Sequence, residues 1–291
     1  MDMSKLSLAQ ASPLGSFAVS ATECVWSVVL PFFNEREALP RTLAALAAQT
    51  IPFRLILVDN GSTDGGGALA RAWIAEHFAD AQLIVERRPG KVAALAAGLQ
   101  RVTTPYLATC DADTWYPQDY LAQAQRLLET PGPVVHGAGA IFVDEPGDRL
   151  GRALNALHWL GAAKALPRQT HTGGAGQVFR TASLRAIGGF DPARWPYVLE
   201  DHEIGQRMLT LGRVRYGAGF WCAPSQRPRD RGAASWTLLE RLLYHFTPEA
   251  AKRWYFYDFL GPRLARRGLL SHRLRVRGLA EPQQEPILAA A

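Results

Sequence analysis

The 291-residue chain contains little cysteine, and this scarcity excludes two classes of cysteine chemistry. Cys24, Cys110 and Cys222 are odd in number, so they cannot form a complete disulfide framework, and their wide separation matches no zinc-binding pattern. We therefore expect a protein of the reducing cytoplasm. Cys110 ends an apolar run, and we predict that it is a small buried side chain.

Long apolar runs are also lacking. No part of the sequence approaches the roughly 20 consecutive apolar residues of a membrane-spanning helix. The beginning of the chain has Lys5 as a lone cation and an apolar pattern broken at Pro13 and Gly15, which makes a poor secretory signal. We expect residues 1–22 to form a flexible arm and residues 280–291 to form a frayed tail.

Acidic residues are scarce only in the last part of the chain. Residues 1–226 hold 20 Lys and Arg against 20 Asp and Glu, whereas residues 227–291 hold 12 against 6, so this last part carries the whole formal charge of +6. A basic region can contact anionic lipid, nucleic acid or a phosphorylated substrate, or it can be a solvated helical surface. The interleaved aromatic and basic residues of RNA-binding modules are not visible, so we expect no nucleic-acid partner. Peripheral contact with an anionic membrane stays open.

Apolar runs and helical patterns alternate in the first part of the chain. Runs at 26–30, 55–58, 83–85 and 106–110 predict strands, and we expect Pro31 to stop the first of them. Apolar residues three or four positions apart predict the helices between them. This alternation requires crossover connections, so it predicts an α/β protein with a parallel sheet whose strands are buried on both faces.

Beyond residue 130 the pattern is less regular. It predicts a strand over 134–143 and a helix that begins near Glu200 and ends at Gly212. Residues 235–260 predict two amphipathic helices separated at Pro248, the second of them rich in aromatic side chains.

Polar residues follow three of the predicted strands, at Pro31–Glu35, Asp59–Asp64 and Asp111–Asp113. The carboxyl ends of parallel strands meet at one edge of a sheet, where ligands bind. Two carboxylates one residue apart, at Asp111 and Asp113, suit Mg²⁺ or Mn²⁺ that also holds a diphosphate. The alternative is an Asx turn that only ends the strand.

Two further positions could contact a nucleotide. Lys91 follows Gly90 at a predicted helix start, where free N–H groups and a cation favour phosphate or ribose, although it could be a solvated lysine. The Asn60 amide can donate to and accept from the edge of a nucleobase, whereas Asn60 and Gly61 together could form a plain turn.

Six short motifs, taken in order, resemble those of the family 2 glycosyltransferases. The motifs are Pro31-Phe32-Phe33-Asn34-Glu35, Val58-Asp59-Asn60-Gly61-Ser62-Thr63-Asp64-Gly65, Gly90-Lys91, Asp111-Ala112-Asp113, Gly188-Gly189-Phe190-Asp191 and Glu200-Asp201. The resemblance covers residues 24–225 and implies the GT-A fold, a Rossmann-like, mostly parallel sheet flanked by helices. It implies a catalytic domain at 23–232, with a nucleotide-binding half at 23–115 and an acceptor-binding half at 116–232, followed by a basic helical extension at 233–279.

The resemblance also implies roles for single residues. Asp201 would deprotonate the acceptor hydroxyl and Glu200 would hold the acceptor, while acidic residues that only stabilise a helix N-terminus are the alternative. Asp113 would make the more direct metal contact, with Asp111 on the nucleotide side. The positions expected at the nucleotide donor are Pro31, Asn34, Glu35, Asp59, Asn60, Lys91, Asp111, Ala112 and Asp113. Gly174 and Gln177, within and directly after the run Gly173-Gly174-Ala175-Gly176, are expected at the donor sugar or the acceptor, although this run could be a simple hinge.

The implied function is a metal-dependent, inverting transfer of one sugar from a nucleotide-diphosphate sugar to a sugar, lipid-linked or small-molecule acceptor. One arginine within 227–231 could hold the diphosphate through two hydrogen bonds, or this segment could be a solvated turn. The Gln-x-x-Arg-Trp signature of processive members is absent, which favours a single transfer.

Two other function classes stay open. A sugar-1-phosphate nucleotidyltransferase would need a glycine-rich loop with arginine after the first strand, where this chain has Pro31–Glu35. A non-catalytic nucleotide-sugar binding protein would hold its ligand without turnover.

Overall fold

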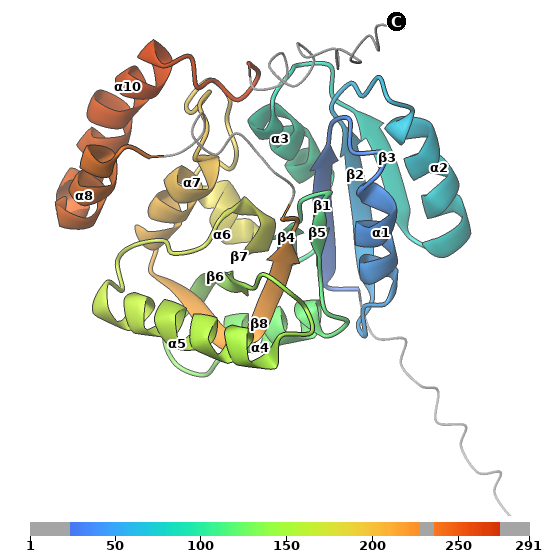
Figure 1. Ribbon diagram of the computed structural model, residues 1–291, viewed down its shortest axis with the longest axis horizontal. Coiled ribbons are helices and arrows are strands. Elements are labelled where there is room, and N and C mark those ends of the chain that lie inside the picture. The colour runs from blue at the N-terminus through green and yellow to red at the C-terminus, as the bar shows by residue number, and fades with distance from the viewer. Residues whose placement is uncertain (1–23, 227–235, 274–291) are drawn as a thin grey trace, which may run out of the picture.

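The computed structural model describes residues 24–226 and 236–273 and contains an eight-stranded sheet (Figure 1). Its strand order is β3-β2-β1-β4-β7-β6-β8-β5. The strands are β1 Trp26–Phe32, β2 Phe53–Asp59, β3 Ala81–Val85, β4 Tyr106–Thr109, β5 Thr114–Trp115, β6 Val135–Phe142, β7 Gln177–Arg180 and β8 Arg213–Pro224. Strands β3, β2, β1 and β4 are parallel, β7 is antiparallel to β4 and β6, β8 is parallel to β6, and β5 is antiparallel to β8. The predicted α/β class and mostly parallel sheet are confirmed.

Helices flank this sheet on both sides. They are α1 Leu39–Ala47, α2 Gly66–His77, α3 Lys91–Arg101, α4 Tyr120–Leu128, α5 Arg149–Ala165, α6 Thr181–Ala186, α7 Glu200–Leu209, α8 Leu238–Phe246, α9 Lys252–Trp254 and α10 Gly261–Arg266. Short 3₁₀ turns lie at η1 Gly174–Gly176 and η2 Glu249–Ala251, and a π-helical turn lies at η3 Tyr255–Leu260. The sequence patterns predicted neither α4 nor α5. The predicted arm at 1–22, the tail at 280–291 and the arginines at 227–231 lie outside the described residues.

Successive residues of the central strands enter two different apolar cores. On one face, Val28 and Leu30 pack with α1, α2 and α4, while on the other face Val29 packs with α3, α6 and α7. The same alternation occurs in β2, where Leu57 and Val58 belong to opposite cores. Both faces are therefore buried, which explains why the strands contain no polar alternation.

Pro31 does not stop the first strand, contrary to the prediction. Strand β1 continues through Pro31 to Phe32, and Pro31 pairs with Val58 of β2. On its other side, the pairing of β1 with β4 has already ended at Val29 and Thr109. The missing N–H of Pro31 therefore costs no hydrogen bond between strands, because β4 no longer pairs with β1 at this position.

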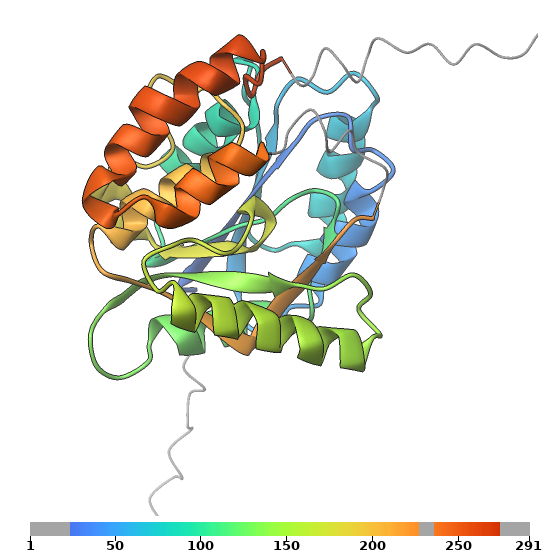
Figure 2. The ribbon, with the colours of Figure 1, turned by 60° about the vertical axis from the view of Figure 1, so that its left-hand side comes forward.

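The C-terminal helices share a core with the segment that precedes α7. Trp195 and Val198 are buried with Tyr244 of α8 and Tyr255 of η3. The helical break predicted at Pro248 is confirmed, because α8 ends at Phe246 and Pro248 caps η2. Figure 2 shows α8 and α10 side by side in front of the sheet. Among the described helices, none combines the length and the apolar character needed to cross a bilayer.

Close contact between α3 and the sheet generates a stability prediction. A Cβ atom added at Gly98 would lie 2.4 Å from Val29 Cγ1, whereas one added at Gly161 of α5 would meet no atom within 4 Å. We expect Gly98→Ala to lower the free energy of unfolding by about 1–3 kcal/mol through overpacking. The control Gly161→Ala should be neutral or should raise it by up to about 1 kcal/mol, because alanine favours a helix. Urea unfolding measures both, and equal stability of the two variants would contradict the packing described here.

Candidate functional site

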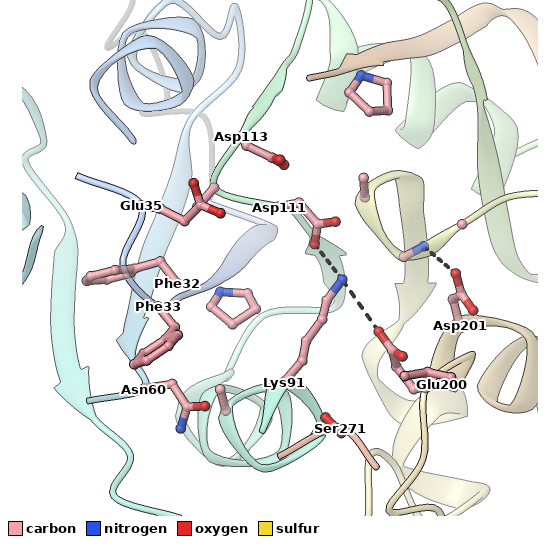
Figure 3. Close-up of a pocket in the computed structure, with 18 of the residues that line it drawn as sticks. Phe32, Phe33, Glu35, Asn60, Lys91, Asp111, Asp113, Glu200, Asp201 and Ser271 are labelled. Carbon is pink, nitrogen blue, oxygen red and sulfur yellow. Dashed lines mark hydrogen bonds and ion pairs between the residues drawn. The ribbon is translucent and has the colours of Figure 1, made fainter. Parts of the chain in front are cut away.

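A cavity of about 510 Å³ opens at the carboxyl edge of the parallel strands (Figure 3). Strands β1, β6 and β8 end there at Phe32, Phe142 and Pro224. Strand β7 runs in the opposite direction, and the pairing of Gln177 with Thr109 places the turn before β7 at the same edge. Strand direction alone therefore brings segments from both halves of the chain to one opening.

The loop at Asp111–Asp113 is held by hydrogen bonds to its backbone. The Asp111 N–H donates to the Tyr116 hydroxyl at 2.9 Å, and that hydroxyl donates to the Ala175 carbonyl at 2.8 Å. The Thr42 hydroxyl lies 2.8 Å from the Ala112 carbonyl. These contacts hold the backbone of the loop and tie it to the turn before β7. The directions of the Asp111 and Asp113 carboxylates are therefore set by other contacts.

Lys91, the first residue of α3, bridges two acidic segments. Its Nζ lies 2.7 Å from Asp111 Oδ1 and 3.5 Å from Glu200 Oε1. Burial acts to lower the pKa of Lys91, but the two carboxylates outweigh burial and hold that pKa above its usual value. The ammonium is therefore charged throughout the physiological range, and it links the loop after β4 to the first turn of α7.

Glu200 and Asp201 begin α7 and face the cavity. Burial raises the pKa of Glu200, and the ammonium of Lys91 offsets only part of that rise. The Asp201 carboxylate accepts from the Gly174 N–H at 2.9 Å through Oδ2 and from the His202 N–H at 2.7 Å through Oδ1. Gln177 donates to the Asp201 carbonyl at 2.9 Å. Backbone donors thus fix the direction of Asp201, while Glu200 is oriented by charge.

Asn60 lines the cavity, but its amide is engaged with the chain itself. Its Nδ2 donates to the carbonyls of Glu86 at 2.9 Å and Arg88 at 2.8 Å, and its Oδ1 accepts from the Gly90 N–H at 2.9 Å. Both amide donors are therefore used to shape the loop that precedes Lys91. This explains an amide at this position, because a carboxylate could not donate to two carbonyls.

Leu199 holds an uncommon backbone conformation next to the acidic pair. Its φ of 64° lies in the left-handed region, which costs a leucine of the order of 1 kcal/mol or more. The preceding Val198 is fixed on both sides, because its N–H donates to the Leu269 carbonyl at 3.2 Å and its carbonyl accepts from Trp195 Nε1 at 2.9 Å. The C-terminal segment therefore maintains the turn that directs Glu200 and Asp201 into the cavity.

Most of the residues predicted from the sequence line this cavity. They are Pro31, Glu35, Asn60, Lys91, Asp111, Ala112, Asp113, Gly174, Glu200 and Asp201. Three others, Asn34, Asp59 and Gln177, do not line it. Asn34 accepts from the Thr63 N–H at 2.8 Å, Asp59 accepts from the Ser62 N–H at 2.8 Å, and Gln177 is only 4% exposed. These three side chains support loops around the cavity.

Several other residues of the cavity wall were not predicted from the sequence. They are Phe32, Phe33, Ala94, Phe142, Val198, Leu199, Pro224 and Ser271, whereas Gly173 and Ala175 belong to the glycine-rich run expected near the donor sugar or the acceptor. Phe32 and Phe33 lie within a motif that was recognised, so their place beside Glu35 was a usable signal. Ser271 had no local signal, since it reaches the cavity only because its N–H donates to the Pro196 carbonyl at 2.8 Å.

The acidic residues at the cavity fit a divalent cation only with help from a ligand. Within the described part of the chain, no group of three or more histidine, cysteine or acidic side chains is arranged to hold a metal ion. Asp113 and Asp111 offer hard oxygen ligands, although Asp111 is paired with Lys91. This donor set suits Mg²⁺ or Mn²⁺, which proteins often bind through one or two carboxylates together with substrate phosphates and water.

Comparison with known proteins identifies related sequences. Residues 27–187, more than half of the chain, match the model of the family described as Glycosyl transferase family 2. An uncharacterized glycosyltransferase of Mycobacterium tuberculosis is 46% identical over 87 residues, which cover 30% of this chain and 36% of the relative. An undecaprenyl-phosphate 4-deoxy-4-formamido-L-arabinose transferase of Sodalis glossinidius is 30% identical over 149 residues, covering 48% of this chain and 45% of the relative. The chain thus spans less than half the length of these relatives.

A solved structure shows the same fold. The mannosyltransferase PcManGT from Pyrobaculum calidifontis, in complex with GDP-Man and Mn²⁺, has a TM-score of 0.60 and 21% identity, over 90% of this chain and 77% of that one. At this identity the likeness concerns the fold, and the predicted GT-A type is confirmed.

The charge bridge at Lys91 generates a prediction about pH. In Lys91→Met the pKa of Glu200 should rise further, because the cation that opposes the rise is lost. A folded-state pKa above the unfolded value makes stability fall as pH increases between the two values. Lys91→Met should therefore lower the free energy of unfolding by about 1 kcal/mol more near pH 8 than near pH 4.3, which is about the pKa of a glutamate in the unfolded chain.

Urea unfolding at the two pH values measures this difference. Lys164→Met is the control, because Lys164 is exposed on α5 and forms no ion pair with the described residues. Its effect should be the same at both pH values. An equal loss for Lys91→Met at both pH values would show that Glu200 does not depend on the bridge.

Proposed function

Because the chain belongs to glycosyl transferase family 2, we propose that it moves one sugar from a nucleotide-diphosphate sugar to an acceptor hydroxyl, with inversion at the anomeric carbon. The chain is a glycosyltransferase with a GT-A type fold. The observation that carries the more specific reaction is the Lys91 bridge, which joins Asp111 of the expected nucleotide side to Glu200 of the expected acceptor side.

The arrangement of side chains supports one orientation of the donor and the acceptor across the cavity. Figure 3 shows Phe32, Phe33 and Asn60 on one side, and Glu200 and Asp201 on the other. Aromatic faces suit the stacking of a nucleobase. We assign the nucleoside of the donor to the Phe32 and Phe33 side, the diphosphate to the region of Lys91, and the acceptor to the region of Glu200 and Asp201.

Asp201 is our choice for the general base. An acceptor hydroxyl has a pKa far above neutrality, so its attack on the anomeric carbon needs a carboxylate to take the proton. The contacts from Gly174 and His202 hold the Asp201 carboxylate in one direction. Glu200 is instead drawn towards Lys91, which suits a residue that positions the acceptor.

The metal requirement is part of the proposal. We assign Asp113 as the more direct ligand of Mg²⁺ or Mn²⁺, because Asp111 shares its charge with Lys91. When bound, the cation would neutralise charge on the diphosphate as it leaves. Lys91 itself supplies a positive charge beside the diphosphate. Its ion pairs with Asp111 and Glu200 keep this charge in place before the donor binds.

The acceptor class and the location are also proposals. A sugar, a lipid-linked group and a small molecule all present a hydroxyl or similar oxygen that this site could accept. The three cysteines are free thiols, which supports the predicted cytoplasmic location. A nucleotidyltransferase is disfavoured because the turn after β1 is Phe33–Glu35 rather than a glycine-rich loop.

Donor binding should depend on Asp113. We expect one class among UDP-, GDP- and dTDP-sugars to raise the thermal midpoint with Mn²⁺, since a ligand present at 100 times its Kd stabilises by about 2.7 kcal/mol. Asp113→Asn should lose the part of this shift that requires Mn²⁺. The control Asp258→Asn changes an exposed acid that does not line the cavity and should keep the Mn²⁺-dependent shift. A full Mn²⁺-dependent shift in Asp113→Asn would contradict the metal assignment.

Turnover should depend on Asp201. With the sugar nucleotide identified by the thermal shift, we expect Asp201→Asn to bind the donor normally but to lower nucleoside diphosphate release about 100-fold or more. Glu200→Gln should mainly raise the KM for the acceptor. If Glu200→Gln abolishes release while Asp201→Asn does not, the base is Glu200. A wild-type protein that binds the donor without any release would be a non-catalytic binder.

A further inference from the structure

The Tyr116 hydroxyl lies in the core and does not line the cavity, yet it joins two segments of the site. It accepts from the Asp111 N–H at 2.9 Å and donates to the Ala175 carbonyl at 2.8 Å. The direction of both hydrogen bonds is fixed, because a backbone N–H can only donate and a carbonyl can only accept. The loop after β4 and the turn before β7 are therefore connected through one buried oxygen atom.

The turn that this hydroxyl reaches, η1, also contacts Asp201. The Gly174 N–H donates to Asp201 Oδ2 at 2.9 Å. The Gly174 carbonyl accepts from the Thr109 hydroxyl at 3.1 Å, and the same hydroxyl lies 3.1 Å from the Gln177 carbonyl. Two hydroxyl groups thus hold the consecutive carbonyls of Gly174 and Ala175, while an N–H of the same turn holds the carboxylate.

Two separate links therefore run from the loop at Asp111 to the first turn of α7. The first is ionic, because the Lys91 ammonium contacts Asp111 and Glu200, and the side chain of Lys91 is 33% exposed. The second is uncharged and runs through Tyr116 and η1 to Asp201. A diphosphate and a cation bound as proposed above would compete for the groups of the ionic link. They cannot reach a hydroxyl inside the core, so the second link should persist when the donor is bound.

Removal of this hydroxyl would deprive two backbone groups of a partner. Among the described residues, the Asp111 N–H makes no other hydrogen bond, and the Ala175 carbonyl would keep only a weak contact with the Cys222 thiol at 3.9 Å. A buried polar group without a partner is unfavourable, so both segments would have to shift to find new ones. A shift of η1 would move the N–H that directs the Asp201 carboxylate.

We propose that Tyr116 is a positioning residue that couples the loop at Asp111–Asp113 to Asp201 through η1. It does not touch the substrate. It keeps the Gly174 N–H aligned with the carboxylate while it holds the start of the loop that carries the acidic pair. The consequence for turnover rests on the proposed function, whereas the coupling between the two backbone segments can be measured without donor or metal.

The neighbouring Tyr120 provides a matched control. It is 0% exposed, like Tyr116, and its ring packs 4.8 Å from that of Tyr116 and 4.7 Å from that of Phe220. Its hydroxyl has no hydrogen-bond partner among the described residues. Tyr120→Phe therefore removes a buried hydroxyl from the same aromatic cluster without removing a hydrogen bond. An effect that occurs only in Tyr116→Phe comes from the two hydrogen bonds.

Amide hydrogen exchange, resolved by residue with NMR, measures the coupling directly. In Tyr116→Phe the amides of Asp111 and Gly174 should exchange at least about tenfold faster than in the wild type, because the hydrogen bonds that order both segments are lost. The amide of Leu57, a fully buried residue of β2, should change less. Tyr120→Phe should exchange like the wild type at all three positions. An equal acceleration at Leu57 would indicate general destabilisation and would overturn the proposal.

Steady-state turnover separates positioning from donor binding. Tyr116→Phe should lower kcat about tenfold or more and leave the KM for the donor within about threefold, since the base loses its direction while the donor contacts remain. Tyr120→Phe should keep both constants. An unchanged kcat in Tyr116→Phe, or the same fall in both variants, would contradict the positioning role. A wild-type protein without turnover would contradict the proposed function and leave the exchange result valid.

A second variant tests the same turn if Tyr116→Phe does not fold. Thr109→Val removes the other hydroxyl that holds the Gly174 carbonyl. It should accelerate exchange at Gly174 and lower kcat, while exchange at Asp111 stays like that of the wild type because the Tyr116 contact is kept. Unchanged exchange at Gly174 in Thr109→Val would show that the hydroxyls do not hold η1, and the proposal would then be wrong.

Discussion

The ammonium of Lys91 is the contact on which the site depends most. It lies between Asp111, which follows β4, and Glu200, which begins α7, so one side chain fixes the separation of two carboxylates that are 89 residues apart in sequence. Without this cation, Asp111, Glu200 and Asp201 would place like charges around one partly buried space, which raises their free energy. The loop that delivers Lys91 is itself shaped by the Asn60 amide through three hydrogen bonds. A neutral side chain thus positions a charged one.

A second constraint comes from the C-terminal helices. They bury Trp195 and Val198 and pair with the chain before α7, where Tyr197 bridges Leu270. Leu199 can keep its left-handed backbone because both of its flanks are fixed by packing and hydrogen bonds. The region therefore supports the acidic pair from behind and also contributes Ser271 to the cavity wall. The same C-terminal helices are therefore basic and also support the acidic pair of the site.

Helix α5 illustrates why a pattern of apolar residues is not always a pattern of burial. Leu150, Leu154 and Leu157 recur with helical spacing but are exposed, whereas Ala156, Trp159 and Leu160 form the side that packs on the sheet. The same helix holds Phe142 at the cavity through Asn155. Opposite sides of one helix thus contact the wall of the cavity and face the outside of the protein.

The sequence alone indicated the parallel strands, because the central ones are apolar on both faces, and it indicated the acidic motifs that parallel topology brings to one edge. It also indicated the family, since six motifs in order carry that information locally. It could not assign Asn60 to a bracing role or exclude Asn34, Asp59 and Gln177 from the cavity surface, because the direction of a side chain depends on neighbours that are distant in sequence. Only the tertiary structure placed Ser271 and Leu199 at the site. Periodicity indicates which side of a helix or strand is apolar, whereas a site is formed by the segments that pack together, and long-range contacts decide which segments those are.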